Sequence, residues 1–479
     1  MSKIKAILSY ARMPEEGLRK LRDGLMDLGI QVKWVTTHDL EQKKVKLYFP
    51  DVFHIKWASY RFNEPWNHFF DKELYDRLMG PKKDTVLPIV ERYGPYEGGS
   101  MEAELRLTHD FSLAHHMIMN CQPKIIIFAK TPESGIEYCL YKLAKHFKIA
   151  TLFTRMGAFP HSRVISTDID YPILNKYWEP SIHTIPICNL EKPGNEMSRI
   201  TEYKINELQN SQNNVIPDYM KNQGLSNLKK DFKYVQFKTN YTYIQLLKDF
   251  IKQGKGSYFK KQLLKENEKY ATKLEEIDFE KRTYYFPLHY QPELTSMPVG
   301  NEFVNQLKII KLLSQNLTIN EQLLIKEHPS TLIAFGKTNS NFRPKSFYKW
   351  IQKMPNVKLV SAYVSSTYLM QNCKGVITIS GTAGLEAIIK NIPVLVFGNA
   401  SYLNGPGVFG IGKESDISEA LRKIKSEIIK NDTVISFIKA LDSVAHHLDD
   451  SPHEKHNNTT IMQLHYVNTM LEGLQKISI

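Results

Sequence analysis

The sequence predicts an α/β fold of two doubly wound domains that face a cleft. Two observations support this prediction. The chain has 479 residues, more than a single hydrophobic core usually serves, which favours two domains. Short apolar runs also alternate with segments of helical periodicity in the first third of the chain and again after residue 281. This alternation is typical of parallel sheets flanked by helices.

The first domain is expected over residues 1–189, where the order strand, helix, strand occurs twice. The first set is KIKAILSY, the amphipathic run EEGLRKLRDGLMDLGI and QVKWVTT. The second set is KIIIFAK (Lys124–Lys130), GIEYCLYKLAKHFK and IATLFTR (Ile149–Arg155). Crossover connections of this kind place the strands side by side in one parallel sheet.

A lysine-rich helical insertion is expected over residues 190–280. Within it, Lys221–Tyr270 holds twelve lysines against four acids, a local charge of +8 in a chain of net charge +13. A solvated helical face explains such a run. The functional alternative is an anionic partner, either the phospholipid surface of the inner membrane or a pyrophosphate-linked lipid. Nucleic acid is not expected as a partner, because no helix-turn-helix, RRM or zinc-finger pattern accompanies the lysines.

The second domain is expected over residues 281–413, where the alternation resumes. Its predicted elements are TYYFPLHY, a helix through EFVNQLKIIKLLSQ, QLLIKEHP, a helix around SFYKWIQKM, NVKLVS, GVITIS, a helix through TAGLEAIIKN, and PVLVFG. Residues 414–479 are predicted to be mostly helical and to pack back across the first domain.

Composition narrows the class of protein. A hydrophobic fraction of 42% with 24% charged residues is that of an ordinary folded protein. No apolar run approaches the roughly 18 residues that span a bilayer, and the start MSKIKAILSYARMPEEG lacks the features of a signal peptide, so a cytoplasmic location is expected. The four cysteines form no CxxC pair, and neither a disulfide framework nor a metal site is predicted.

Two motifs follow predicted strands of the second domain, where doubly wound sheets bind their ligands. LLIKEHP ends with Lys326, His328 and Pro329, and SGTAGLE opens a helix. Hydroxyls and free N–H groups at a helix start suit a phosphate, and a lysine and a histidine add positive charge. Blander explanations are a turn role for His328 and helix capping by the hydroxyls, since SGTAG has no Walker lysine. The joint occurrence favours a phosphate cradle.

A third motif, HYQPE, opens the second domain with His289, Gln291 and Glu293 after a predicted strand. The prolines on either side hold the backbone extended and irregular, which suits a loop that lines a cleft. A proline-rich hinge between domains is the alternative.

The order FPLHYQPE, KEHP, FY with PNV, and GVITISGTAGLEAIIKNIPVLVFG closely resembles the bacterial capsule polysaccharide biosynthesis proteins, over about Tyr284–Gly410. That group includes glycosyltransferases of the GT-B architecture, two Rossmann-like domains facing a cleft, among them Kdo transferases that use a CMP-activated sugar. The first domain resembles it more loosely, through FAKTPESG and the strand before TRMGAFPHSRVIS. Similar HP and small-hydroxyl elements in bacterial sialyltransferases and CDP-glycerol polymerases point to a cytidine nucleotide.

The resemblance implies that residues of these motifs bind the donor nucleotide: Gln291, Lys326, His328, Pro329, Ser380, Gly381, Thr382 and Glu386. Lys326 and His328 would contact the phosphate, the SGT turn would cap it, and Glu386 would reach the ribose. His289, Glu293 and Arg155 would line the cleft.

One departure from the family pattern concerns the catalytic acid. Where the Kdo transferases carry an E-D-G arrangement, this sequence reads TRMG, with Arg155 and Met156 in place of the acids. Sugar transfer needs a base for the acceptor hydroxyl, and the candidates are Glu293, Glu91 in VERYG and Asp168 in STDID. The one D-x-D, Asp168 with Asp170, lies in the first domain, so catalysis without a metal or other cofactor is expected.

The sequence thus predicts a glycosyltransferase of capsule or surface polysaccharide synthesis. Its partners would be a nucleotide-sugar donor, CMP-linked, and a glycan or lipid-linked acceptor. Transfer of a polyol phosphate from a CDP donor would use the same cradle. A non-catalytic assembly or export protein on the same fold is the alternative from another class.

Overall fold

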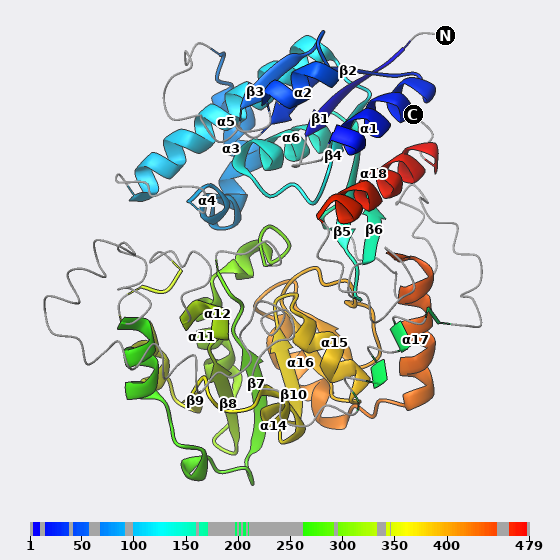
Figure 1. The fold of residues 1–479 in the computed structure, drawn as a ribbon. Helices are drawn as coiled ribbons and strands as arrows, with labels where there is room; N and C mark the ends of the chain where they lie inside the picture. The colour runs from blue at the N-terminus through cyan, green and yellow to red at the C-terminus, as the bar shows by residue number, and fades with distance from the viewer. Residues whose placement is uncertain are drawn as a thin grey trace, which may run out of the picture. The chain divides into compact units, whose positions relative to one another are not determined.

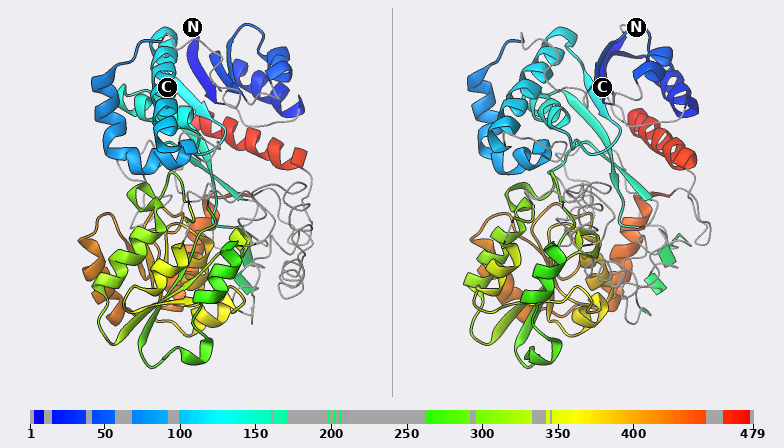
Figure 2. Two further views of the ribbon diagram at one scale, coloured as in Figure 1. Left: turned by 90° about the vertical axis from the view of Figure 1, so that its left-hand side faces the viewer. Right: turned by 60° about the vertical axis from the view of Figure 1, so that its left-hand side comes forward.

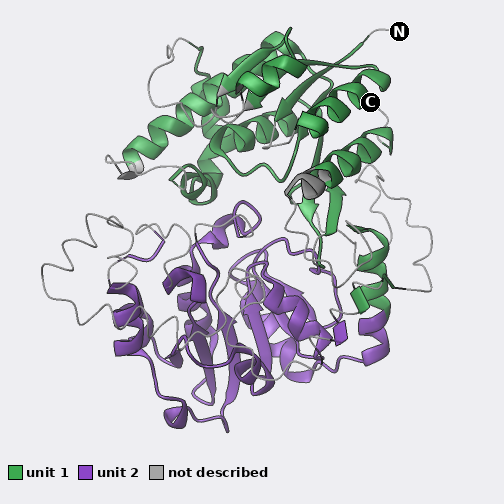
Figure 3. Ribbon diagram, in the orientation of Figure 1, with its two compact units in different colours: residues 1–204, 436–479 green, residues 205–435 purple. Residues whose placement is uncertain are grey.

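The computed structural model confirms an α/β protein with two Rossmann-like domains (Figure 1). Two compact units divide the chain: unit 1 comprises residues 1–204 and 436–479, and unit 2 comprises residues 205–435 (Figure 3). The residues that the structure describes are 3–9, 15–37, 42–56, 68–91, 99–159, 162–170, 197–198, 201–202, 205–206, 209, 262–291, 296–332, 342–344, 346–447 and 459–476.

The described strands of unit 1 form one sheet in the order β13-β6-β5-β4-β1-β2-β3. The strands β1 to β5 pair in parallel, whereas β6 is antiparallel to β5 and β13 is antiparallel to β6. Their bounds are β1 Ile4–Ser9, β2 Ile30–Thr37, β3 Phe53–Lys56, β4 Ile125–Phe128, β5 Ala150–Met156, β6 Ser162–Ser166 and β13 His446–His447. All four residues of β4 are buried, as expected of a central strand covered on both faces.

Helices of unit 1 come from both ends of the chain: α1 Glu15–Asp27, α2 Gln42–Tyr48, α3 Lys72–Met79, α4 Lys83–Glu91, α5 Gly99–Cys121, α6 Gly135–His146 and α18 Thr459–Lys476. Helix α18 packs beside α1, β5 and β6 (Figures 1 and 2). Its Val467, Met470 and Leu474 are buried in the core that α1 and the sheet share. Residues 436–479 therefore return to the first domain, whereas residues 414–435 of the predicted C-terminal segment belong to unit 2.

The described strands of unit 2 form an all-parallel sheet in the order β12-β11-β10-β7-β8-β9. Their bounds are β7 Arg282–Pro287, β8 Glu321–Lys326, β9 Val357–Val360, β10 Gly375–Thr378, β11 Val394–Val396 and β12 Val408–Gly410. The chain winds outward from β7 in one direction and from β10 in the other. The carboxyl ends of β7 and β10 therefore form the switch point at which such sheets bind ligands.

Helices flank this second sheet: α11 Gln306–Asn316, α12 Pro329–Leu332, α13 Phe347–Gln352, α14 Ser366–Gln371, α15 Thr382–Ile389 and α16 Asp416–Ser426. Helix α17, Asn431–Ser443, crosses the boundary between the units. The core joins Phe286, Ile325 and Leu359 of the sheet to Leu313 and Ile351 of α11 and α13.

The compact units divide the chain at residues 204 and 435, whereas the sequence predicted boundaries at residues 189, 280 and 413. Most of the predicted insertion, including Lys221 to Lys261 of the lysine-rich run, lies outside the described residues. In the part of the chain that is described, no helix has both the length and the apolar character to cross a membrane.

Candidate functional site

The three motifs of the second domain lie at the carboxyl ends of three neighbouring strands. His289 follows β7, His328 follows β8, and Ser380 follows β10. Since β10, β7 and β8 are adjacent in the sheet, the motifs meet at one edge, across the switch point.

His289 spans the switch point itself. Its Nε2 accepts a hydrogen bond from the backbone N–H of Ile379 at 3.2 Å and lies 3.1 Å from the hydroxyl of Thr378. Because Nε2 is an acceptor, the neutral ring carries its proton on Nδ1. The side chain is buried, so His289 acts as a strut between β7 and β10.

Helix α15 begins beside that histidine without a side-chain cap. Its N-cap residue is Gly381, whose own N–H donates to the Thr378 hydroxyl at 2.9 Å, and Tyr402 donates its hydroxyl to the Gly381 carbonyl. The N-cap position is thus occupied by Gly381 and not by Ser380 or Thr382. Thr382 is exposed, and Glu386 is half-buried one turn further along. The first turn of α15, at the positive end of the helix dipole, suits an anion.

The HP turn presents a histidine of defined tautomer. Pro329 begins the short helix α12, and the backbone N–H of Ser330 donates to Nδ1 of His328 at 3.2 Å. In the neutral ring the proton is therefore on Nε2, which makes that nitrogen a hydrogen-bond donor. His328 is half-buried, and its ring centroid lies 6.0 Å from that of Tyr290.

Lys326, the last residue of β8, points toward α14 and not toward the HP turn. Its side chain is 2% exposed and donates from Nζ to the hydroxyl of Ser366 at the start of α14, at 2.8 Å. Burial lowers the pKa of this amine to about 7. A contact between Lys326 and a donor phosphate stays a prediction.

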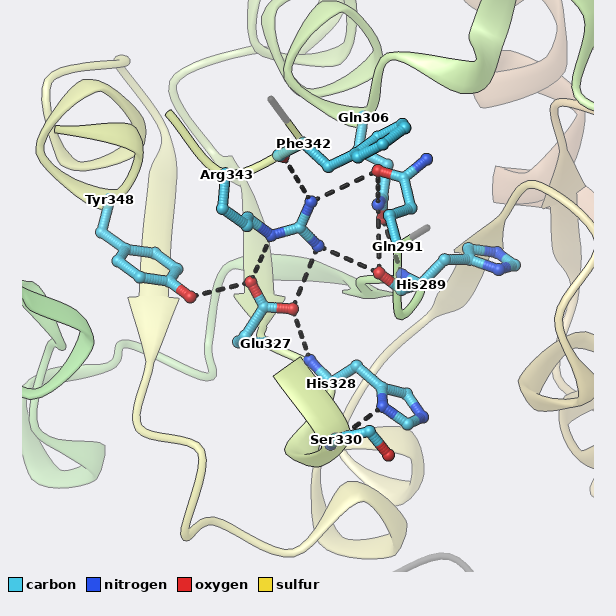
Figure 4. Close-up of polar contacts among 9 residues, drawn as sticks. All are labelled: His289, Gln291, Gln306, Glu327, His328, Ser330, Phe342, Arg343 and Tyr348. Carbon is cyan, nitrogen blue, oxygen red and sulfur yellow. Dashed lines mark hydrogen bonds and ion pairs between the residues drawn. The ribbon is translucent and has the colours of Figure 1, made fainter. Parts of the chain in front are cut away.

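The motifs did not indicate a buried ion pair between Glu327, which follows β8, and Arg343 (Figure 4). Nε of Arg343 is 2.6 Å from Oε2 of Glu327, and both side chains are buried. Burial opposes the charge on Arg343, but the carboxylate raises its pKa above the usual value. Gln291 is part of the same cluster: its amide oxygen accepts from Arg343 and Gln306, and its amide nitrogen donates to the Val304 carbonyl. The amide of Gln291 thus faces protein groups here, and its role toward a donor stays a prediction.

The remaining candidates lie in unit 1 or outside the described residues. Asp168 accepts hydrogen bonds from the hydroxyl of Tyr141 at 2.6 Å and pairs with Lys145 at 2.7 Å. Burial alone would raise the pKa of Asp168, but these donors lower it. Arg155 is buried within β5, and burial lowers its pKa to about 10. Glu91 is half-buried at the end of α4.

Glu293, the candidate base in HYQPE, lies outside the described residues. In the part of the chain that is described, no group of three or more histidine, cysteine, aspartate or glutamate side chains is placed to hold a metal ion.

Solved structures similar to this chain share little sequence with it. The UDP-GlcNAc 2-epimerase from Neisseria meningitidis, bound to UDP-GlcNAc, is 13% identical, with 91% of this chain and 97% of that chain covered and a TM-score of 0.26. The epimerase from Methanocaldococcus jannaschii is 10% identical (89% and 94% covered, TM-score 0.26). The calicheamicin glycosyltransferase is 9% identical (93% and 95% covered, TM-score 0.24). Likenesses at this level carry no argument about function.

A search of the curated proteins found no match. The model of the family described as "Capsule polysaccharide biosynthesis protein" matches residues 199–431. This range includes every strand of the unit 2 sheet and all three motifs at its carboxyl edge. Over residues 199–431, the chain is therefore similar to the capsule polysaccharide biosynthesis protein family.

Proposed function

We propose that this protein is a glycosyltransferase of capsule or surface polysaccharide synthesis that uses a cytidine-activated sugar as donor and a glycan or lipid-linked acceptor. The observation that supports it best is the start of α15 at the β7/β10 switch point, with Gly381 as its N-cap residue. Backbone N–H groups in that position bind phosphate in many doubly wound sheets. The match of residues 199–431 to the capsule polysaccharide biosynthesis family model agrees with this proposal.

In this proposal the donor phosphate lies against the first turn of α15, next to the hydroxyls of Ser380 and Thr382. The Nε2–H of His328 donates to the same phosphate. As the bond between the sugar and the phosphate oxygen breaks, negative charge grows on the leaving nucleotide, and these fixed donors stabilise it. The acceptor oxygen forms the new bond to the sugar and gives its proton to a base.

One of the three proposed bases is argued against by its surroundings. Lys145 and Tyr141 hold the pKa of Asp168 below its usual value, which makes its carboxylate a weaker base than an ordinary one. Glu91 and Glu293 stay candidates. Arg155, at the position where the Kdo transferases carry an acid, favours a non-catalytic assembly protein as the second candidate function. Transfer of a polyol phosphate from a CDP donor would use the same phosphate contacts.

Ligand-dependent melting of the purified protein tests this proposal. We expect CMP or CDP to raise the melting temperature more than UDP or GDP, since a ligand at about 100 times its Kd stabilises by about 2.7 kcal/mol. His328→Ala should lose most of the shift. His146→Ala, which removes an exposed histidine at the end of α6, is the matched control and should keep it.

Absence of a shift with every nucleotide would overturn the transferase. A shift with cytidine nucleotides but no transfer or hydrolysis of CMP-sugars would support the assembly protein.

A further inference from the structure

A continuous set of buried hydrogen bonds joins the segments that follow β7 and β8 (Figure 4). Through the ring of His289 it extends to the segment that follows β10. Its centre is Arg343, which lies between α12 and α13 in the chain and belongs to none of the three motifs. The side chain of Arg343 is 1% exposed.

All five N–H groups of Arg343 are occupied by protein acceptors. Nε and Nη2 donate to the two carboxylate oxygens of Glu327, at 2.6 and 3.1 Å. Nη2 also donates to the His289 carbonyl at 3.0 Å, and Nη1 donates to the Phe342 carbonyl at 2.9 Å and to the Gln291 amide oxygen at 3.3 Å. A guanidinium has no further donors. Arg343 therefore acts on other protein groups and not on a ligand.

One arm of the network runs from Arg343 to the HP turn. The carboxylate of Glu327 accepts, besides the two bonds from Arg343, the hydroxyl of Tyr348 at 2.8 Å and the backbone N–H of His328 at 2.8 Å. The side chain of Glu327 is fully buried. The carboxylate thus fixes the backbone at the residue whose imidazole faces the proposed phosphate.

The other arm runs from Arg343 to the start of α15. Gln306 bonds both backbone groups of His289, accepting from its N–H at 2.7 Å and donating to its carbonyl at 3.1 Å. Arg343 donates to the same carbonyl. The ring of His289 then holds the backbone N–H of Ile379, two residues before the N-cap residue Gly381.

A buried ion pair is a weak source of stability, because desolvation of the charges offsets most of their attraction. A fully satisfied buried network does, however, fix the geometry of the segments that it joins. Here those segments are the three that carry the motifs at the switch point. Their fixed geometry matters most if all three contact one ligand.

We propose that Glu327, Arg343 and Tyr348 are positioning residues that hold the HP turn and the start of α15 in the geometry that binds the donor phosphate. This inference rests on the proposed function. None of the three contacts the donor; each acts through His328 or through His289 and α15.

Tyr348→Phe is the sharpest test, because the chain offers a matched control. Tyr284 is also a fully buried tyrosine, and its hydroxyl donates to Glu321 at 3.2 Å at the opposite, amino end of β7 and β8. Each substitution removes one buried hydrogen bond to a glutamate, and we expect comparable losses of stability. Only Tyr348→Phe should weaken the binding of CMP, by about threefold to tenfold. Equal CMP affinity in the two variants would overturn the proposal.

Arg343→Lys is the second variant. It keeps a positive charge beside Glu327 but cannot make the forked bonds to His289 and Gln291. We expect the Kd for CMP to rise by roughly tenfold or more, measured below the melting temperature of the variant. Binding as tight as in the unchanged protein would contradict the proposal.

Hydrogen exchange separates this inference from the proposed function, because it needs no ligand. In the ligand-free protein, Tyr348→Phe should speed exchange together in residues 288–291, 327–331 and 379–384, and Tyr284→Phe should not. Failure of the unchanged protein to bind CMP or CDP would overturn the proposed function, and exchange would then decide alone whether the network couples the segments. Faster exchange near residue 348 only would refute the coupling.

Discussion

Lys326 and Glu327 are neighbours in the chain with opposite surroundings. The carboxylate of Glu327 faces Arg343 and Tyr348, whereas the amine of Lys326 lies on the other side of the sheet against Ser366. The alternation of side chains along an extended segment explains the separation. Burial lowers the pKa of Lys326 to about 7, which makes its charge a source of instability in neutral solution.

We predict that Lys326→Met stabilises the protein, and does so more at low pH. Between about pH 7 and pH 10.5 the unfolded chain binds a proton at Lys326 that the native protein does not, so the native protein gains stability as the pH rises through this window. Below pH 7 the burial penalty is present in full. The gain from the substitution should be roughly 2–3 kcal/mol larger at pH 6 than at pH 9 in urea unfolding.

The control for this prediction is Lys374→Met, which alters an exposed lysine next to β10. It should show no such pH dependence. The same gain from Lys326→Met at both pH values would contradict a depressed pKa.

At the scale of elements, α15 shows why a helix start contains a glycine. The φ of Gly381 is −75°, which any residue adopts, so its backbone does not require glycine. A Cβ at this position would lie 3.0 Å from Cε1 of His289 and 3.1 Å from the Thr378 hydroxyl. Glycine therefore allows the close approach of the histidine ring that joins β7 to β10.

We predict that Gly381→Ala displaces this ring and costs about 1–2 kcal/mol of stability. Because the ring holds the backbone that leads into α15, the melting shift with CMP should also shrink. Gly412→Ala serves as control: its Cβ would meet only Asp416 Oδ2, at an ordinary 3.5 Å. A full CMP shift in the Gly381→Ala protein would show that the ring position does not matter for binding.

The elements that the sequence predicted are those with a local signal. Apolar runs ended by HYQ, KEHP and SGT indicate strand ends, and the structure places all three at one sheet edge. Arg343 carries no such signal, because its partner Glu327 is sixteen positions away and the contact obeys no helical or strand period. Strand β13, which pairs antiparallel with β6, could not be predicted either, because its two residues are too few to show an alternation of apolar and polar side chains.

At the scale of the whole molecule, unit 1 is assembled from two separate parts of the chain. Asp442 of α17 holds them together, accepting hydrogen bonds from the backbone N–H and hydroxyl of Ser198, from Thr201 and from His447. Burial opposes the charge, but these donors hold the pKa of Asp442 at about 2.

We predict that Asp442→Asn removes about 1–2 kcal/mol of stability at pH 7. The folded pKa lies below the usual 3.8, so the carboxylate contributes in full above about pH 4, and its contribution is lost as the pH falls through 2. The difference between the two proteins should therefore narrow between pH 4 and pH 2 in thermal unfolding. Asp432→Asn on the same helix is the control. A constant difference down to pH 2 would contradict the depressed pKa.

The position of α18 in the chain determines the order in which the two units can fold during translation. All of unit 2 leaves the ribosome before α18, whose Val467, Met470 and Leu474 complete the core under β1, β4 and β5. Unit 2 can close its core from one unbroken stretch of chain, while the nascent sheet of unit 1 keeps an apolar face uncovered. Unit 1 can therefore complete its core only after unit 2 has been synthesised.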